Sequence, residues 1–273
     1  MHGIKGCGLG LRREFLSEIT EDGFLPDWWE ITPENCIYMP HHHRKAFEKA
    51  ISLRPVVAHG LSLSIGSPDP LDMVFLRQLK DFFDRYGIEH YSEHLSFSGF
   101  EGAQTYELLP LPMTQEVITH VSERVRIVQD VLERPLILEN ATYYYVPEAH
   151  MSEAEFINGV LRESGAMMLL DVNNVYVNSI NHGFDATTFI DQMDLDKVAY
   201  IHVAGHYADE SLGLLIDTHG RKVKDEVWDL LKKTVGERAI PVMIERDNNI
   251  PPLHELAMEY KKLESLVKEV SYA

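Results

Sequence analysis

The chain has 273 residues, of which 45% are hydrophobic, and it carries a formal net charge of −18 at pH 7. This acidic balance argues against nucleic acid as a partner, because nucleic-acid-binding proteins present a basic face and only short basic pieces such as Lys261-Lys262 occur here. The length permits a large buried core, yet no apolar stretch approaches the roughly 20 residues of a membrane span. We therefore expect a protein that binds neither nucleic acid nor membrane.

The N-terminal segment and the cysteines indicate a compartment. The segment lacks the continuous apolar run of roughly 7 to 15 residues that a secretion signal requires. The two cysteines, Cys7 and Cys36, form no C-x-x-C pair, so free thiols in a reducing environment are favoured over a disulfide. We expect a cytoplasmic protein. Because no repeat, low-complexity tract or linker interrupts the chain, we also expect a single domain over residues 1–273.

Short apolar segments typical of β-strands recur along the chain. They alternate with stretches of helical periodicity, which is the pattern of βα units in a parallel sheet buried on both faces. In chain order they cover 6–11, 28–32, 55–59, 88–94, 135–139, 167–171, 199–202 and 241–245. Eight such units in about 250 residues match the size of a (β/α)8 barrel of the triosephosphate-isomerase (TIM) type. The sequence therefore predicts an α/β fold with one TIM barrel.

The segments between these strands carry apolar residues at three- and four-residue intervals, which is typical of helices. The predicted helices cover 12–19, 44–53, 71–86, 115–132, 153–163, 187–193, 224–235 and 253–270. A capping box from Ser152 to Glu155 supports the start of one of them. Two long connections, 96–113 and 206–223, would lie at the catalytic face of a barrel, where such loops commonly cover a site.

Histidines and acidic residues recur at or just beyond the ends of the predicted strands or in the connections that follow them. Because every strand of a barrel opens onto the same face at its carboxyl end, residues scattered over the sequence converge there. The set comprises His59, His94, Glu139, Asp171, His202, Asp217, His219 and Glu245. A structural role for each would need its own explanation. One zinc or iron ion takes three or four such ligands, and carboxylates can bridge ions, so the set predicts a centre of two or three metals.

Asp217, His219 and His206 lie in a connection rather than in a predicted strand. Residues two apart in an extended segment point the same way, so Asp217 and His219 could both reach one cluster. The alternative is a turn that Asp217 caps. For His206 we favour a hydrogen-bonding role beside the ligands, because metal-bound groups need such partners. A proton carrier or a surface residue are the alternatives for His206.

Three other polar features have structural interpretations. If His94 points into the barrel, the pleat turns Glu93 away from it, which favours a salt bridge under a helix. The three histidines at 41–43 open a predicted helix that is polar on all sides, so a solvated helix start is favoured over a metal site. The tyrosines at 143–145 would either form a wall of the pocket or pack a loop.

Motifs over nearly the whole chain resemble one family, the multinuclear non-haem iron-dependent oxidases, long catalogued only as a domain of unknown function. The strings that carry the resemblance are, in order, GLGLRREF, PEN, SEHLSF, LLPLP, LEN, LLDVNNVYVN, NHG, IHVAGH, IDTHG and VWDLL. LLDVNNVYVN together with IHVAGH is the most specific part of the match.

This resemblance implies a TIM barrel that holds two or three irons as mixed Fe(II) and Fe(III), with zinc or manganese as substitutes. It implies dioxygen-dependent modification of cysteine residues in a ribosomally made precursor peptide, which a separate small partner protein presents. The family's ligands would fall on the eight residues named above, with Asn140, Asn173 or Asn174 nearby. In the reaction itself we expect roles for Glu139, Asp171, Asn174 and His206.

Other functions remain open at this point. The ligand order also resembles the endonuclease IV type of abasic-site nuclease, which holds three zincs in a similar barrel. There a ligand histidine follows the aspartate by three residues, whereas this chain has Asn174 three residues after Asp171, and a neutral amide is a poor zinc ligand. A two-metal sugar isomerase in a related barrel lacks support from any sugar-specific feature. A metal-storing or scaffold protein would be the non-enzymatic alternative.

Overall fold

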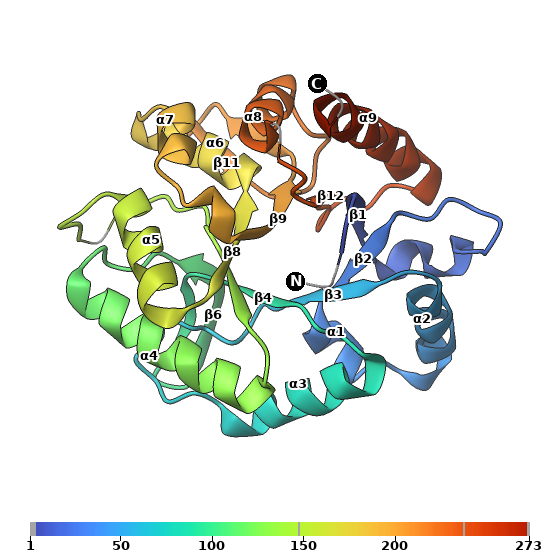
Figure 1. Ribbon diagram of the computed structural model, residues 1–273, viewed down its shortest axis with the longest axis horizontal. Helices are drawn as coiled ribbons and strands as arrows, with labels where there is room; N and C mark the ends of the chain where they lie inside the picture. Colours follow the sequence, from blue (N-terminus) through green and yellow to red (C-terminus); the bar gives the residue numbers. More distant parts are fainter. Residues whose placement is uncertain (1–3, 147, 237, 272–273) are drawn as a thin grey trace.

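The computed structural model describes residues 4–146, 148–236 and 238–271, and their strands form a closed barrel (Figure 1). The barrel strands are β1 (Cys7–Gly10), β2 (Trp28–Ile31), β3 (Val56–His59), β4 (Tyr91–His94), β7 (Leu136–Glu139), β8 (Met167–Asp171), β9 (Val198–Val203) and β12 (Val242–Ile244). They pair in the order β1-β12-β9-β8-β7-β4-β3-β2, and all pairs are parallel. This confirms the predicted TIM barrel.

Helices surround the barrel, as Figure 1 shows. They are α1 (Pro33–Ile37), α2 (His41–Leu53), α3 (Met73–Tyr86), α4 (Gln115–Leu132), α5 (Glu153–Ser164), α6 (Val172–His182), α7 (Ala186–Asp191), α8 (Asp225–Val235) and α9 (Leu253–Ser271), with 3-10 helices η1 (Arg13–Glu18) and η2 (Leu195–Lys197). The segment predicted as a helix over 12–19 is thus a 3-10 helix. The sequence prediction missed α6, because asparagines such as Asn173 and Asn174 are buried on it and interrupt the apolar periodicity.

Each of the two long connections contains an antiparallel hairpin. The first pairs β5 (Phe97–Phe100) with β6 (Ala103–Leu109), and the second pairs β10 (His206–Asp209) with β11 (Leu214–Asp217). They follow β4 and β9, so both leave the barrel at the carboxyl ends of its strands. In the second hairpin His206 is paired with Asp217, which brings the two ends of the hairpin together.

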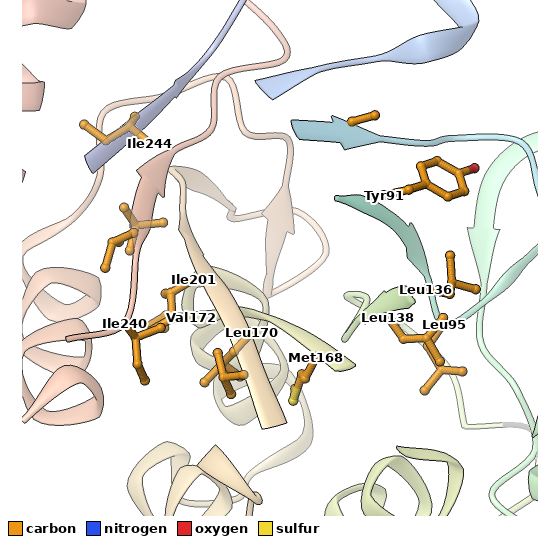
Figure 2. Packing of buried hydrophobic residues seen from close by; sticks show 14 of the residues in the cluster. Tyr91, Leu95, Leu136, Leu138, Met168, Leu170, Val172, Ile201, Ile240 and Ile244 are labelled. Carbon is orange, nitrogen blue, oxygen red and sulfur yellow. The ribbon is translucent and has the colours of Figure 1, made fainter. Parts of the chain in front are cut away.

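Side chains alternate between the barrel interior and the surrounding helices along each strand. The interior contains a layer of buried side chains, namely Trp28, Val57, Ile137, Leu169, Tyr200 and Met243. The next residue along a strand faces the helices, and Figure 2 shows Leu138, Leu170, Ile201 and Ile244 packed in this outer core. Because the period is two, the residue after that faces inward again, at the mouth of the barrel.

The cysteines and the start of α2 agree with the sequence predictions. Cys7 and Cys36 are both buried and free, as expected. The helix α2 begins at His41, which is exposed, in agreement with a solvated helix start there. Among the described residues, no helix combines the length and the apolar composition that crossing a membrane requires.

Candidate metal centre

Ionisable side chains stand two residues beyond inward-facing residues, at the carboxyl ends of seven barrel strands. They are Glu30, His59, His94, Glu139, Asp171, His202 and Glu245. Six of them are at most 4% exposed, and the side chain of His94 is 11% exposed. So many buried ionisable groups need charged partners or metal ions to offset the loss of hydration.

The first group of potential ligands consists of His59, His94 and Glu139. The Nε2 atoms of His59 and His94 lie 3.3 Å apart, and each lies 3.1 to 3.3 Å from Oε2 of Glu139. Ligand atoms arranged tetrahedrally at roughly 2.0 to 2.1 Å from one ion are about 3.3 to 3.4 Å apart. The spacing of the three atoms therefore suits a single metal ion.

The second group consists of Glu139, Asp171, His202 and Glu245. The Nδ1 atom of His202 lies 3.0 Å from Oε2 of Glu245, 3.5 Å from Oε1 of Glu139 and 4.0 Å from Oδ2 of Asp171. Glu139 therefore presents Oε2 to the first group and Oε1 to the second. A carboxylate placed in this way can bridge two ions.

The third group consists of His219, Glu245 and Asp247. The Nδ1 atom of His219 lies 2.8 Å from Oε2 of Glu245 and 3.2 Å from Oδ2 of Asp247. Glu245 is shared with the second group, so three groups joined by two carboxylates form one continuous cluster. Arg12 fixes the position of Asp247 in the third group, because its guanidinium donates a hydrogen bond to Oδ1 of Asp247 at 2.6 Å.

Unpartnered buried atoms test whether metal ions fit this cluster. Both carboxylate oxygens of Glu139, Oδ2 of Asp171, Nδ1 of His202 and Oε2 of Glu245 are buried without a hydrogen bond of acceptable geometry. Buried polar atoms are otherwise almost always hydrogen-bonded. These atoms point at one another within the three groups, so the donor set fits metal ions.

The charges of the cluster shift its pKa values strongly. Burial lowers the pKa of His59, but the carboxylates of Glu139 and Glu30 outweigh it and raise that pKa to about 10. Burial likewise opposes the charged form of His202, yet Glu30 and Glu245 raise its pKa well above the usual range. The pKa of Asp171 is raised, mainly by burial. Without metal, protonated histidines therefore balance the carboxylates, and metal ions would displace these protons.

The junction between β8 and α6 orients Asp171. Its Oδ1 atom accepts the backbone N–H of Asn174 at 2.7 Å and so caps α6, which leaves Oδ2 facing the cluster. The side chain of Asn140 bonds both backbone groups of Asp171, at 2.9 and 3.0 Å. The Oδ1 atom of Asn174 lies 3.4 Å from Nε2 of His219 and accepts from Thr142. Both asparagines thus hold the ligands in place.

The structure places Asp217 and His206 beside the cluster rather than within its three groups. Asp217 lies 2.9 Å from Nε2 of His219, on the side of the ring that faces away from Glu245 and Asp247. His206 donates from Nδ1 to Oδ1 of Asn173 at 2.8 Å, and Asn173 donates to Asp217. His206 thus reaches the cluster through two other side chains.

Sequence reasoning missed Glu30 and Asp247. Glu30 lies 3.0 Å from Nε2 of His202, and Asp247 belongs to the third group. A signal existed for each. Glu30 follows the inward residue Trp28 by two positions within a predicted strand, and Asp247 follows Glu245 by two, the same spacing that singled out Asp217 and His219.

Glu93 faces away from the cluster but is not in a salt bridge under a helix. Its Oε1 atom accepts the backbone N–H of Leu63 at 2.8 Å and the hydroxyl of Tyr91 at 3.0 Å. Its nearest basic atom is Nδ1 of His94, 3.9 Å away. Two neutral donors replace the expected cation, and burial raises the pKa of Glu93 to about 7.

The three tyrosines divide between the two interpretations. Tyr143 is buried and stacks on His182, which is loop packing. Tyr144 accepts the backbone N–H of Asp217 through its hydroxyl at 2.9 Å, so it contributes to the rim of the cluster. Tyr145 is 68% exposed.

A cavity of about 460 Å³ opens onto the cluster. His59, Glu245 and Asp247 border it. The rest of its lining combines apolar side chains, such as Met39 and Phe47, with polar ones, such as Arg13 and Asn35. Cys36 also lines it, but burial raises the pKa of this thiol to about 12, so it stays protonated at neutral pH. The cavity can admit an apolar group while a polar group meets the cluster.

A known protein family matches nearly the whole chain. The model of the family described as RiPP precursor modification enzyme MbnB/TglH/ChrH matches residues 6–268, where RiPP denotes a ribosomally made and then modified peptide. The chain belongs to this family. Membership of the RiPP precursor modification enzymes agrees with the sequence resemblance and indicates an enzyme with a precursor peptide as substrate and a multinuclear metal site.

Relatives at the level of whole chains are named UPF0276 protein. One from Shewanella sediminis is 46% identical over 260 residues, covering 94% of this chain and 92% of its own. Another, from Acinetobacter baylyi, is 44% identical over 269 residues, covering 98% and 93%. The chain thus matches these relatives over nearly their whole length.

Solved structures confirm the fold. Endonuclease IV from Thermus thermophilus has a TM-score of 0.61 at 15% identity, covering 97% of this chain and 99% of that one. The IOLI protein with a binding zinc atom has a TM-score of 0.66 at 13% identity, with the same coverage. Identities this low show the TIM barrel alone and carry no activity over to this RiPP precursor modification enzyme.

Proposed function

We propose that the protein is a non-haem oxidase with two or three irons that uses dioxygen to modify cysteine residues of a ribosomally made precursor peptide. One observation carries the proposal. In a chain of the RiPP precursor modification family, three ligand groups are joined by Glu139 and Glu245 into one buried cluster. We further propose that a small partner protein presents the peptide and that the reaction takes place in the cytoplasm.

The ligand assignment follows the three groups. His59, His94 and Glu139 would hold one ion, and Glu139, Asp171, His202 and Glu245 a second. A third would bind His219, Glu245 and Asp247. Asp217 would orient His219 by accepting from its Nε2 atom, so that Nδ1 faces the metal. Imidazole and carboxylate ligands suit iron, and they also accept zinc or manganese.

Held by these ligands, iron would supply the redox chemistry that couples oxidation of the substrate cysteine to reduction of dioxygen. The protein's own contribution is placement. The cavity would admit the substrate segment, and apolar side chains such as Met39 and Phe47 would contact the residue beside the cysteine. Asn174 holds Asp171 and His219, and His206 supports Asp217 through Asn173.

The test combines metal analysis with a cysteine-dependent assay. Protein from iron-replete cells, purified without chelator, should carry two or more iron ions per chain. With a cysteine-containing peptide encoded beside its gene, it should consume dioxygen and change the peptide's mass. A peptide with serine in place of cysteine is the matched control and should do neither.

Two results would overturn the proposal. One is less than one equivalent of any metal in protein that has been offered iron and zinc. The other is cleavage of abasic DNA at physiological salt that disappears in Glu245→Gln, which would make the protein a hydrolase of the endonuclease IV type. The acidic charge and Asn174 favour the oxidase.

A further inference from the structure

A chain of buried side chains connects two histidines of the cluster beneath its metal-facing atoms. His59 Nδ1 lies 2.8 Å from Ser92 Oγ, and Ser92 Oγ lies 2.7 Å from the hydroxyl of Tyr200. That hydroxyl lies 2.9 Å from Oε2 of Glu30, and the same oxygen lies 3.0 Å from Nε2 of His202. All five residues are at most 3% exposed, so water does not compete for these bonds.

The direction of each hydrogen bond follows from the chemistry of the groups. A carboxylate only accepts, so Oε2 of Glu30 receives the hydroxyl proton of Tyr200 and the Nε2 proton of His202. A tyrosine hydroxyl is protonated at neutral pH, so Tyr200 donates this proton to Glu30.

Tyr200 has no second proton, so Ser92 must donate to it. Ser92 then accepts from Nδ1 of His59. Every donor in the chain is directed toward one oxygen atom of Glu30.

These directions fix which nitrogen of each histidine can bind a metal. His59 carries its proton on Nδ1, which leaves the lone pair of Nε2 facing His94 and Glu139 of the first group. His202 carries its proton on Nε2, which leaves the lone pair of Nδ1 facing Glu245 and Glu139 of the second group. His59 thus presents Nε2 to its metal position, whereas His202 presents Nδ1.

We propose that Glu30 is a positioning residue that sets the tautomers of His59 and His202 and thereby prepares two neighbouring metal positions. The proposal rests on the metal centre described under the proposed function. Glu30 itself belongs to none of the three ligand groups found among the described residues, and its Oε2 atom is occupied by Tyr200 and His202. Its action on the metals therefore passes through these partners.

The decisive variant is Glu30→Met, which keeps the length of the side chain and removes both carboxylate oxygens. Because Tyr200 and His202 share Oε2, this variant removes the acceptor of both, and the Nε2 proton of His202 loses its partner. His202 would move its proton to Nδ1, the atom that faces the metal. We expect affinity for one zinc ion to fall about 10 to 100-fold, with another ion retained.

Tyr200→Phe is the matched control. It cuts the chain between Glu30 and Ser92 but keeps the bond from His202 to Glu30. Ser92 can turn to the carbonyl oxygen of Ala58, 3.3 Å away, and still accept from His59. We expect this variant to retain the zinc ion at His202. Its affinity for the ion at His59 should fall less than the affinity of Glu30→Met falls for the ion at His202.

The measurement uses zinc alone, without iron, dioxygen or peptide. Isothermal titration gives the number of ions, and NMR of ring-¹⁵N histidine shows which nitrogen of each ring is metal-bound, with His202→Ala and His59→Ala assigning the signals. The wild type should show His202 bound through Nδ1 and His59 through Nε2. Glu30→Met should lose the first signature, and Glu30→Asp, which keeps the carboxylate, should retain it.

Unchanged zinc affinity and unchanged ring signals in Glu30→Met would overturn the inference. If that variant does not fold, Glu30→Asp decides alone. The shorter aspartate lies farther from His202, so this variant should bind one zinc ion more weakly while the Nδ1 signature persists. Wild-type affinity for zinc would refute the positioning role of Glu30. A wild type that binds fewer than two zinc ions would instead count against the metal centre itself, so the two failures are distinguishable.

Discussion

Glu139 and Glu245 are the residues on which the cluster depends most, because each belongs to two ligand groups. A glutamine has one acceptor oxygen and two donors, so it cannot bridge two ions. We predict that Glu139→Gln lowers the metal content by about two ions per chain, whereas loss of His94, which serves one group, lowers it by about one. Metal analysis by mass spectrometry checks this.

Glu153→Gln is the control for that experiment, because Glu153 is a carboxyl group that bonds Tyr143 away from the cluster. It should retain the full metal content. A Glu139→Gln variant that also retains it would show that Glu139 bridges nothing.

His219 belongs to the third ligand group alone, so its substitution tests that group separately from the other two. It follows β11 in a connection that contributes no strand to the barrel. We predict that His219→Ala removes about one ion and leaves the barrel folded, because loss of a ligand or its support commonly lowers metal affinity 10 to 100-fold or more. Metal analysis and circular dichroism of the same sample distinguish this result from unfolding, which would indicate a structural turn.

His120→Ala is the matched control, since His120 lies on the outer helix α4 and bonds the carbonyl oxygen of Ser67. It should lose no metal. Full iron content in His219→Ala would place His219 outside the centre.

At the scale of elements, the junction of β8 and α6 gives Asp171 two functions that substitution can separate. Asparagine caps helices as well as aspartate does, but it is a poor metal ligand. We predict that Asp171→Asn keeps the free energy of unfolding of the metal-free protein within about 0.5 kcal/mol, whereas Asp171→Ala loses about 1 kcal/mol with the cap. Both should lose metal from the second group.

Urea unfolding with a chelator measures the first effect, and metal analysis measures the second. Equal stability of the alanine and asparagine variants would show that the cap contributes little. Wild-type metal content in Asp171→Asn would remove Asp171 from the ligands.

The strands and most helices could be predicted, because their signals are local. An apolar run that ends in His59 or Asp171 is visible in five residues, and the capping box at Ser152 is confirmed. α6 was not predicted, because its buried asparagines look polar until their partners in the segment after the neighbouring strand β7 are known. Asn174 donates to the carbonyl oxygen of Asn140, and Asn178 to that of Ala141.

At the scale of the whole molecule, the metal-free protein should respond to pH. The carboxylates around His59 raise its pKa from 6.5 to about 10 despite its burial. A histidine whose pKa is higher in the folded than in the unfolded protein stabilises the fold fully at pH values below its unfolded-state pKa. This stabilisation is lost as the pH rises through its folded-state pKa. We predict that the free energy of unfolding with chelator falls by a few kcal/mol between pH 6.5 and 10, at about 1.4 kcal/mol per pKa unit.

Denaturant titrations at several pH values check this prediction, and His59→Ala should flatten the slope while His120→Ala keeps it. The metal-loaded protein should show a smaller decline, because metal ions replace the protons and bind more tightly as pH rises. A metal-free protein with constant stability over this range would contradict the charge balance described for the cluster.

The sequence by itself determined the barrel and the family. It also determined seven of the eight residues in the three ligand groups, Asp247 being the exception. Strand periodicity and strand ends could be predicted because they are properties of neighbouring residues. Only the tertiary structure decided how these residues are grouped, that Asp217 stands behind His219, and that Glu30 lies against His202. Residues 30 and 202 are far apart in the chain and meet only when the barrel closes. Which nitrogen of a histidine faces a metal depends on such a partner, and no local pattern encodes it.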